Sequence, residues 1–361
     1  MKKSLRISTL LLTMVMLMCG CSANSKPEVQ SGSQSGSQPK ASAPSSSAAG
    51  KAGAGTEEDY PKNPITLVVP FSAGGSIDTL CRTLGPFMGK ELDTNFVIED
   101  MPGAGSQVGL TYLVQTAKAD GYTLSEVSEP HMSFSIAVQK APYTVDDFAF
   151  LGMIQVDPVA MIVKQESQWN TIGELIDYIK QNPGKVAIGC TQMSGPQVVM
   201  LYMQQSMDLD FTIVPYEGGG EGRAALIGDH IDAYFGFVQA NYSMNDIGKC
   251  LAIGSDQRSQ LWPDAPTIAE AVPDDSGFAD IAVQMASYRT IAVPAAFKEQ
   301  YPERFEKLAQ ALETVFNNTE YQAECEKTGQ LEIMEWHDSA EATEMVHQSF
   351  ELLSGMAHYF E

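Results

Sequence analysis

Residues 68–84 read VVPFSAGGSIDTLCRTL and join two different patterns. The first letters end an apolar, β-branched run, 65–70, that is typical of a buried strand. The last letters begin a helical pattern, in which apolar residues recur every three or four positions as far as Leu92. A turn rich in serine and glycine, 72–76, separates the two. The stretch therefore predicts a strand that passes through a glycine turn into a helix, the repeating unit of α/β folds.

This turn presents main-chain donors at the start of a helix. Gly74 and Gly75 lack side chains that would keep a ligand from the backbone. Ser76 and Asp78 lie in the predicted first turn, where N–H groups have no intrahelical partner and the helix dipole favours an anion by about 0.3–1 kcal/mol. Such a turn also occurs as a tight connection without a ligand, so by itself it leaves both interpretations open.

Strand and helix patterns alternate along the chain. Further apolar strand patterns lie at 96–99, 123–127, 186–189, 211–215, 231–235 and 250–254. Thr171 and Glu174 have the spacing of a capping box, which predicts a further helix start. The alternation predicts α/β layers with mostly parallel or mixed sheets. The last part of the chain reads instead as consecutive helices, at 303–316, 320–327 and 339–359.

Four loops rich in glycine and serine follow predicted strands. They are 71–76, 102–106, 190–196 and 216–222. In open parallel sheets, ligands bind beyond the carboxyl ends of the strands, where the connecting loops begin helices. We therefore expect these loops to line one shared ligand cleft.

The N-terminus has the pattern of an exported lipoprotein. Three basic residues precede an apolar run, 7–18, which is shorter than the ~20 residues that span a bilayer. The run ends in a sequence that resembles a lipobox, so we predict a signal peptide over 1–20 and a lipid anchor on Cys21. A plain signal peptide with an incidental cysteine is the alternative. Residues 21–59 are rich in Ser, Gly, Ala and Pro and predict a disordered tether.

The charge and the cysteines narrow the range of partners. Removal of the three positive charges of the signal takes the formal charge from −23 to −26, which makes nucleic acid a poor partner. The cysteines beyond Cys21 show no C-x-x-C spacing, and Cys81 and Cys325 lie in helical patterns as small apolar residues. We therefore predict free thiols at Cys81, Cys190, Cys250 and Cys325, and disulfide pairing in an exported protein is the alternative.

No motif for catalysis, a cofactor or a metal accompanies these loops. The sequence contains no G-x-S-x-G elbow, and neither G-x-G-x-x-G nor a P-loop follows the first strand. Its five histidines show no metal-ligand spacing. We therefore predict a binding protein without a metal or cofactor, and not an enzyme. A hydrolase acting on a small acid, or a lipoprotein with a sensing or other non-transport role, are the alternatives.

Six stretches of the body occur in the order and at the spacing of one known family. They are YPKNPITLVVPFSAGGSIDTLCR (60–82), MPGAGSQVG (101–109), ADGYTL (119–124), VPYEGGGEGRAALIGDHIDAYF (214–235), LWPDAPTIAEA (261–271) and YRTIAVPA (288–295). On these motifs the chain resembles the solute receptors of tripartite tricarboxylate transporters, the Bug family. The resemblance implies a two-lobed α/β fold of the type II periplasmic-binding-protein kind, with a ligand cleft between the lobes. We expect lobe 1 at 60–160, lobe 2 at 161–285, and a return to lobe 1 with C-terminal helices at 286–361.

The resemblance also implies a function and a set of binding residues. It implies an extracytoplasmic receptor, anchored to the membrane, that captures a small organic carboxylate and delivers it to membrane permease subunits; we expect a monomer. The loop CTQMSGPQ (190–197) matches the family's second-lobe loop rich in Ser, Thr and Gly. Residues of this loop and of the matching stretches are expected to bind the ligand: Phe71, Ser72, Ala73, Gly74, Gly75, Ser76, Asp78, Thr191, Ser194, Gly195, Tyr216 and Gly218.

Three further residues could touch the ligand, and each has a second interpretation. Glu129 would favour a ligand with an amino group if it faces the cleft; otherwise it is a solvated loop residue. Arg223 could pair with a ligand carboxylate or with a neighbouring surface acid. His131 could contact the ligand or be merely exposed.

Overall fold

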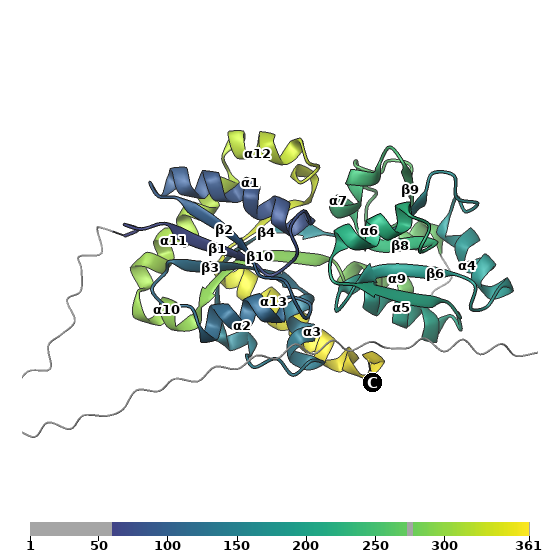
Figure 1. The fold of residues 1–361 in the computed structure, drawn as a ribbon, viewed down its shortest axis with the longest axis horizontal. Coiled ribbons are helices and arrows are strands. Elements are labelled where there is room, and N and C mark those ends of the chain that lie inside the picture. The colour runs from purple at the N-terminus through teal and green to yellow at the C-terminus, as the bar shows by residue number, and fades with distance from the viewer. Residues whose placement is uncertain (1–59, 273–276, 361) are drawn as a thin grey trace, which may run out of the picture. The chain divides into compact units, whose positions relative to one another are not determined.

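The computed structural model describes residues 60–272 and 277–360. In these residues the strands form two sheets, one of six and one of five strands, with helices packed on both faces of each (Figure 1). The signal peptide, the lipidated Cys21 and the tether predicted for residues 1–59 lie outside the described residues and stay predictions. No helix in the described part of the chain is long and apolar enough to cross a bilayer.

The six-stranded sheet and the helices that cover it form the first lobe. Its strands are β1 (Ile65–Val69), β2 (Phe96–Asp100), β3 (Thr123–Glu129), β4 (Phe148–Asp157), β10 (Ser287–Pro294) and β11 (Met334–His337). Their order is β11-β4-β10-β3-β1-β2. β1 is parallel to β2 and β3, whereas β10 is antiparallel to β3 and β4. The sheet is therefore mixed.

The five-stranded sheet and its helices form the second lobe. Its strands are β5 (Val159–Lys164), β6 (Ala187–Thr191), β7 (Thr212–Tyr216), β8 (Ala233–Phe237) and β9 (Gly248–Gly254). Their order is β7-β6-β8-β5-β9. β6 is parallel to β7 and β8, and β5 is antiparallel to β8 and β9. The two lobes thus repeat one arrangement, three parallel strands extended by antiparallel ones.

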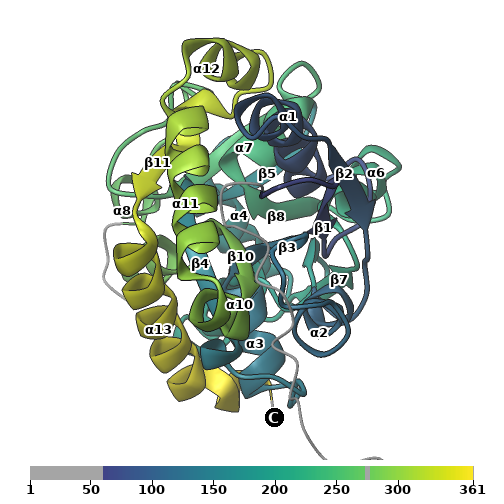
Figure 2. The ribbon, with the colours of Figure 1, turned by 90° about the vertical axis from the view of Figure 1, so that its left-hand side faces the viewer.

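The helices bury apolar stripes against these sheets. In the first lobe, one face is covered by α1 (Ser76–Glu91), α10 (Ala295–Gln300), α11 (Pro302–Phe316) and α12 (Thr319–Glu326), and the other by α2 (Gln107–Gln115), α3 (His131–Ala137) and α13 (Ser339–Met356) (Figure 2). In the second lobe, one face is covered by α4 (Ile172–Gln181), α5 (Gly195–Ser206), α8 (Ile268–Ala271) and α9 (Phe278–Gln284), and the other by α6 (Gly219–Ile227) and α7 (Val238–Asn241). Short 3-10 turns are η2 (Val145–Asp147), η3 (Tyr242–Met244), η4 (Leu331–Ile333) and η5 (Ala357–Phe360).

Two segments carry the chain between the lobes. β4 continues into β5 with only Pro158 between them, and β10 returns to the first sheet directly after α9. Near the end of α13, Leu353 and Met356 are buried in the core of the second lobe. The lobes are therefore joined by two strand connections and by the packing of the C-terminal helix.

The predicted two-lobed α/β architecture is confirmed, and the predicted strands occur within two or three residues of their expected bounds. The sequence patterns did not predict the short edge strand β11, which lies in the part expected to be consecutive helices. They also did not predict β4, β5 and β10. Nearly all their residues are buried, so the sequence shows apolar runs without the alternation that marks a half-exposed strand.

Two local predictions have different outcomes. The Thr171 side chain accepts the Glu174 amide at 3.1 Å, as a capping box requires, but the Glu174 carboxylate accepts the amide of Asn170 at 2.6 Å instead of that of Thr171. Only half of the predicted box therefore forms. The prediction of free thiols is confirmed at Cys81, Cys190, Cys250 and Cys325.

Candidate functional site

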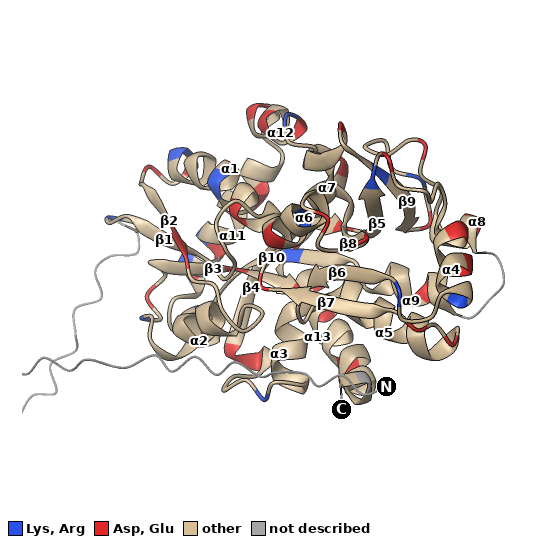
Figure 3. Cartoon of the chain, turned by 45° about the vertical axis from the view of Figure 1, so that its right-hand side comes forward, with Lys and Arg blue, Asp and Glu red and all other residues tan. Residues whose placement is uncertain are grey.

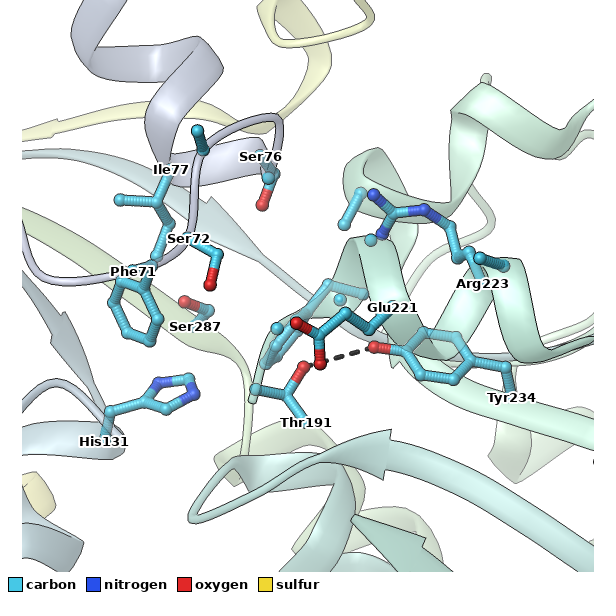
Figure 4. A pocket seen from close by; sticks show the side chains of 18 of the residues that line it. Phe71, Ser72, Ser76, Ile77, His131, Thr191, Glu221, Arg223, Tyr234 and Ser287 are labelled. Carbon is cyan, nitrogen blue, oxygen red and sulfur yellow. Dashed lines mark hydrogen bonds between the residues drawn. The ribbon is translucent and has the colours of Figure 1, made fainter. Parts of the chain in front are cut away.

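A cavity of about 340 Å³ lies between the two lobes (Figure 4). The first lobe lines it with Phe71, Ser72, Ala73, Gly75, Ser76, Ile77, His131, Ser287 and Arg289. The second lobe lines it with Thr191, Gly218, Gly219, Gly220, Glu221, Arg223, Ala224, Tyr234, Phe237 and Ala240. The structure thus brings three of the four glycine-rich loops together. The fourth, 102–106, is not part of the lining; its Gly105 packs against Met193.

The predicted binding residues divide into two groups. Those that line the cavity are Phe71, Ser72, Ala73, Gly75, Ser76, His131, Thr191, Gly218 and Arg223. Those that lie outside its lining are Gly74, Asp78, Glu129, Ser194, Gly195 and Tyr216. For each residue of the second group a contact within the protein explains its position.

At the N-terminus of α1, one predicted donor is already occupied. The amide of Gly74 donates to the Asp78 carboxylate at 2.7 Å, and the other oxygen of Asp78 pairs with Arg82 at 2.5 Å. Gly74 has φ +79°, a left-handed conformation that favours glycine and turns its amide toward the helix. Asp78 is only 5% exposed. Gly74 and Asp78 therefore hold the loop in shape instead of facing the cavity.

The donors that remain lie one to three residues further on. Gly75 is the N-cap of α1 and no side chain caps the helix. The amides of Gly75, Ser76 and Ile77 have no acceptor within residues 60–272 and 277–360. Because the first N–H groups of a helix lack intrahelical partners, they are available to a ligand at this wall of the cavity.

The second lobe brings its own glycine-rich loop to the opposite wall. Gly218 is the N-cap of α6, and a Cβ on Gly218 would lie 3.7 Å from the Ser72 side chain of the first lobe. A Cβ on Gly222 would lie 2.2 Å from the ring of Tyr234, so glycine there lets α6 approach β8. The Tyr234 hydroxyl in turn lies 3.2 Å from the Thr191 hydroxyl. Burial raises the pKa of Tyr234 to about 12, so the phenol stays protonated.

The neighbours of Thr191 and Gly218 in sequence serve the second lobe itself. The Ser194 hydroxyl donates to the Thr191 carbonyl at 2.5 Å and is fully buried. A Cβ on Gly195 would lie 2.1 Å from the carbonyl oxygen of Met285, so this glycine permits a close backbone approach. Tyr216 packs over Gly189 on the neighbouring strand. Their loops reach the cavity, but the Ser194 hydroxyl and the Tyr216 ring contact other parts of the second lobe.

Arg289, in β10, lines the cavity and was not identified from the sequence. Its side chain is 1% exposed and pairs with Asp157 at 2.5 Å. It also donates to the Gln155 side chain at 2.8 Å and to the Ser76 hydroxyl at 3.2 Å. Asp157 accepts the amide of Gln239, in the second lobe, at 2.9 Å. This network links the end of β4 and the beginning of β10, where the chain passes between the lobes, to the start of α1. An arginine inside the apolar strand pattern YRTIAVPA was the available signal.

His131 lines the cavity as a neutral side chain. It is 2% exposed, and its ring stands edge-on to Phe71 with the centroids 4.9 Å apart. Burial, and next the charge of Arg289, lower its pKa to about 3. Neither ring nitrogen has a hydrogen-bond partner among the described residues, and Figure 4 shows the ring directed into the cavity. The prediction that His131 is merely exposed is therefore wrong.

Both interpretations of Glu129 are wrong. It is fully buried at the end of β3, and its carboxylate accepts the Ser133 amide at 3.4 Å and the Ser349 hydroxyl at 3.3 Å. Burial raises the pKa of Glu129 to about 8. This acid is therefore neither solvated nor part of the cavity lining. The acid that does line the cavity is Glu221, which is exposed.

Arg223 reaches the cavity without an acid partner. No ion pair or hydrogen bond connects its guanidinium to any described residue, so the predicted alternative, a pair with a surface acid, is wrong. Burial lowers the pKa of Arg223, and Asp157, the acid that acts on it electrostatically, is bound to Arg289. A desolvated cation that lacks a protein partner is complementary to an anionic ligand. Within the described ranges, no cluster of His, Cys, Asp and Glu is arranged to hold a metal ion.

The chain is similar to one family of known proteins. A family model described as "Tripartite tricarboxylate transporter family receptor" matches residues 80–349. A UPF0065 protein of Bordetella pertussis is 31% identical over 230 residues, 61% of this chain and 69% of that protein. A Rhodopseudomonas palustris protein solved with adipate has a TM-score of 0.72 at 21% identity, covering 83% of this chain and 98% of that one. MatC of the same organism, solved with bound malate, has a TM-score of 0.71 at 20% identity, covering 82% and 100%.

Proposed function

The chain belongs to the family of tripartite tricarboxylate transporter receptors, and we propose that it captures a small organic carboxylate outside the cytoplasm and delivers it to permease subunits in the membrane. The observation that carries this proposal is the composition of the cavity. Amides at the start of α1 lie on one wall and Arg223 on the other, and neither has a partner within residues 60–272 and 277–360. Each hydrogen bond to a charged acceptor contributes roughly 1.5–3 kcal/mol, so a carboxylate held by both walls would keep the lobes together.

The net charge of the chain opposes this binding only weakly. The formal charge is −23, and Figure 3 shows acidic residues on helices and loops of both lobes. Exposed charges are screened beyond about 8 Å at physiological salt, whereas donors inside the cavity act at contact distance. The local donors therefore decide the affinity for an anion.

We further propose that Cys21 carries the lipid anchor and that residues 21–59 tether the receptor to the outer face of the membrane. We propose a monomer that binds its ligand without a metal or cofactor. The lipobox-like sequence and the Ser/Gly/Ala/Pro composition support the anchor and the tether.

Native mass spectrometry of the freshly purified full-length protein, with detergent for the anchor, tests the function. We expect a co-purified small acid. Thermal unfolding with a panel of carboxylates then measures binding, because a ligand at 100 times its Kd stabilises the folded state by about 2.7 kcal/mol. Since adipate and malate occupy proteins of the same fold, they belong in the panel. Absence of any stabilising acid would overturn the receptor proposal, and turnover of the bound acid would replace it with an enzyme.

A further inference from the structure

Two side chains of opposite charge point into the cavity from α6. Glu221 and Arg223 both belong to the lining, and Figure 4 shows both directed inward. They pair neither with each other nor with another charged group in the part of the chain that is described. The other cation of the lining, Arg289, is neutralised by Asp157. Among the described residues, the cavity therefore offers a ligand one free cation, Arg223, and one free anion, Glu221.

Arg223 faces the start of α1 across the space between the lobes. Ser76 and Arg223 line both this cavity and a neighbouring one of about 350 Å³, and Figure 4 shows their side chains on opposite sides of the space between the lobes. A carboxylate between them would accept hydrogen bonds from the α1 amides and from the guanidinium. Because the guanidinium has lost part of its hydration, it gains more from such a partner than an exposed arginine would.

The rest of the lining is apolar or uncharged. Phe71, Ile77 and Phe237 contribute apolar surface from both lobes. The side chain of His131 is only 2% exposed, and this burial keeps it neutral. It can offer hydrogen bonds to a ligand. A second carboxylate placed here would be desolvated without a cation to compensate it, which is costly.

We propose that the cavity binds a zwitterionic amino acid with an uncharged, apolar or aromatic side chain. Its carboxylate lies between the N-terminus of α1 and Arg223, and its ammonium group faces Glu221. Its side chain lies against Phe71 and Phe237, with His131 available to a neutral polar atom. This inference rests on the proposed function and narrows its ligand class, because it ranks di- and tricarboxylates below amino acids.

Calorimetry on the unmutated full-length protein gives the first test. Leucine, phenylalanine and tyrosine are each compared with the analogue that lacks the amino group: 4-methylpentanoate, 3-phenylpropanoate and 3-(4-hydroxyphenyl)propanoate. Succinate and citrate complete the set. We expect at least one amino acid to bind about tenfold more tightly than its analogue and than either polycarboxylate. An analogue or a polycarboxylate that binds as tightly as the amino acids would overturn the inference while supporting the receptor; no binding by any acid would remove both.

Two variants then separate the charges. Glu221→Gln should weaken the amino acid about tenfold and leave its analogue within about twofold, whereas Arg223→Met should weaken both. Glu217→Gln is the matched control, because Glu217 is exposed, lies four residues earlier and is not part of the lining. Equal loss of both ligands in Glu221→Gln would contradict the assigned ammonium contact. Should that variant fail to fold, the comparison of analogues on the unmutated protein decides.

Discussion

Two glycine-rich loops begin helices on facing walls of the cavity, and each helix has an acid in its first turn. In the first lobe, Asp78 accepts the amide of Gly74 and pairs with Arg82, so the acid stabilises its own loop. In the second lobe, Glu221 binds no side chain of the described residues and points into the cavity. An acidic residue at the third position of each helix therefore has a structural role in one lobe and, among the described residues, is free for a ligand in the other.

The difference arises from the backbone before each helix. Gly74 lies in the left-handed region, which brings its amide to the Asp78 carboxylate. Both N-caps, Gly75 and Gly218, are extended, but the residue before Gly218, Glu217, is not in the left-handed region, so its amide is not turned toward the first helical turn. The first loop is also held in place by β10, because the Arg289 guanidinium donates a hydrogen bond to the Ser76 hydroxyl. The wall formed by the first lobe thus consists of backbone donors held in place by side chains. The wall formed by α6 carries charges that no described residue pairs with.

The largest loss of stability is expected on substitution of Asp157, the counter-ion of Arg289. Asp157→Asn would leave the buried Arg289 without its counter-ion, so the free energy of unfolding should fall by about 3–5 kcal/mol, measured by urea denaturation. Glu320→Gln is the control, because the Lys90–Glu320 pair is 72% and 69% exposed and should cost less than about 1 kcal/mol. Similar losses in the two variants would show that the buried network does not support this wall.

A smaller effect compares the two first-turn acids directly. Asp78→Ala removes an ion pair and the acceptor of the Gly74 amide, and should cost about 1.5–3 kcal/mol of unfolding free energy. Glu221→Ala should change it by no more than about 0.5 kcal/mol, because the side chain is exposed and unpaired. Denaturant unfolding without ligand measures both. If Glu221→Ala cost as much as Asp78→Ala, the contrast between the loops would be lost.

The smallest change in stability is expected on substitution of Gly74 and Gly220 by alanine, and the two changes should have opposite signs. Gly74→Ala forces a side chain into the left-handed region and should destabilise the protein by about 1–2 kcal/mol, although the space around it is open. Gly220→Ala also enters open space, but in a right-handed helix, and should stabilise the protein by about 0.4–1 kcal/mol. Thermal unfolding of the two single variants tests the pair. A shift of both in the same direction would contradict the conformational explanation.

Sequence reasoning found the loops that form the cavity but only some of its side chains. Ser72 and Thr191 could be named because the family resemblance covers their loops, and Arg223 because it lies at a helix start in the glycine-rich region. Tyr234 could not, because it lies inside a strand that reads as ordinary core, and Arg289 is visible only as a charge in an apolar pattern that does not show what it faces. Which face of such a strand borders the cavity depends on the pairing of β8 with β5 and of β10 with β4, and pairing is a long-range property.

By itself, the sequence determined the alternation of strands and helices, the glycine turn before α1 and the positions of the loops, because these follow from local periodicity and backbone preference. Only the tertiary structure decided which donors stay free. Whether Asp78 or a ligand occupies the Gly74 amide, and whether Arg223 meets an acid, depends on distances between groups that local patterns do not contain. Hydrogen bonds and ion pairs act over a few ångströms, so the chemistry of the cavity is settled only when the two lobes bring their loops together.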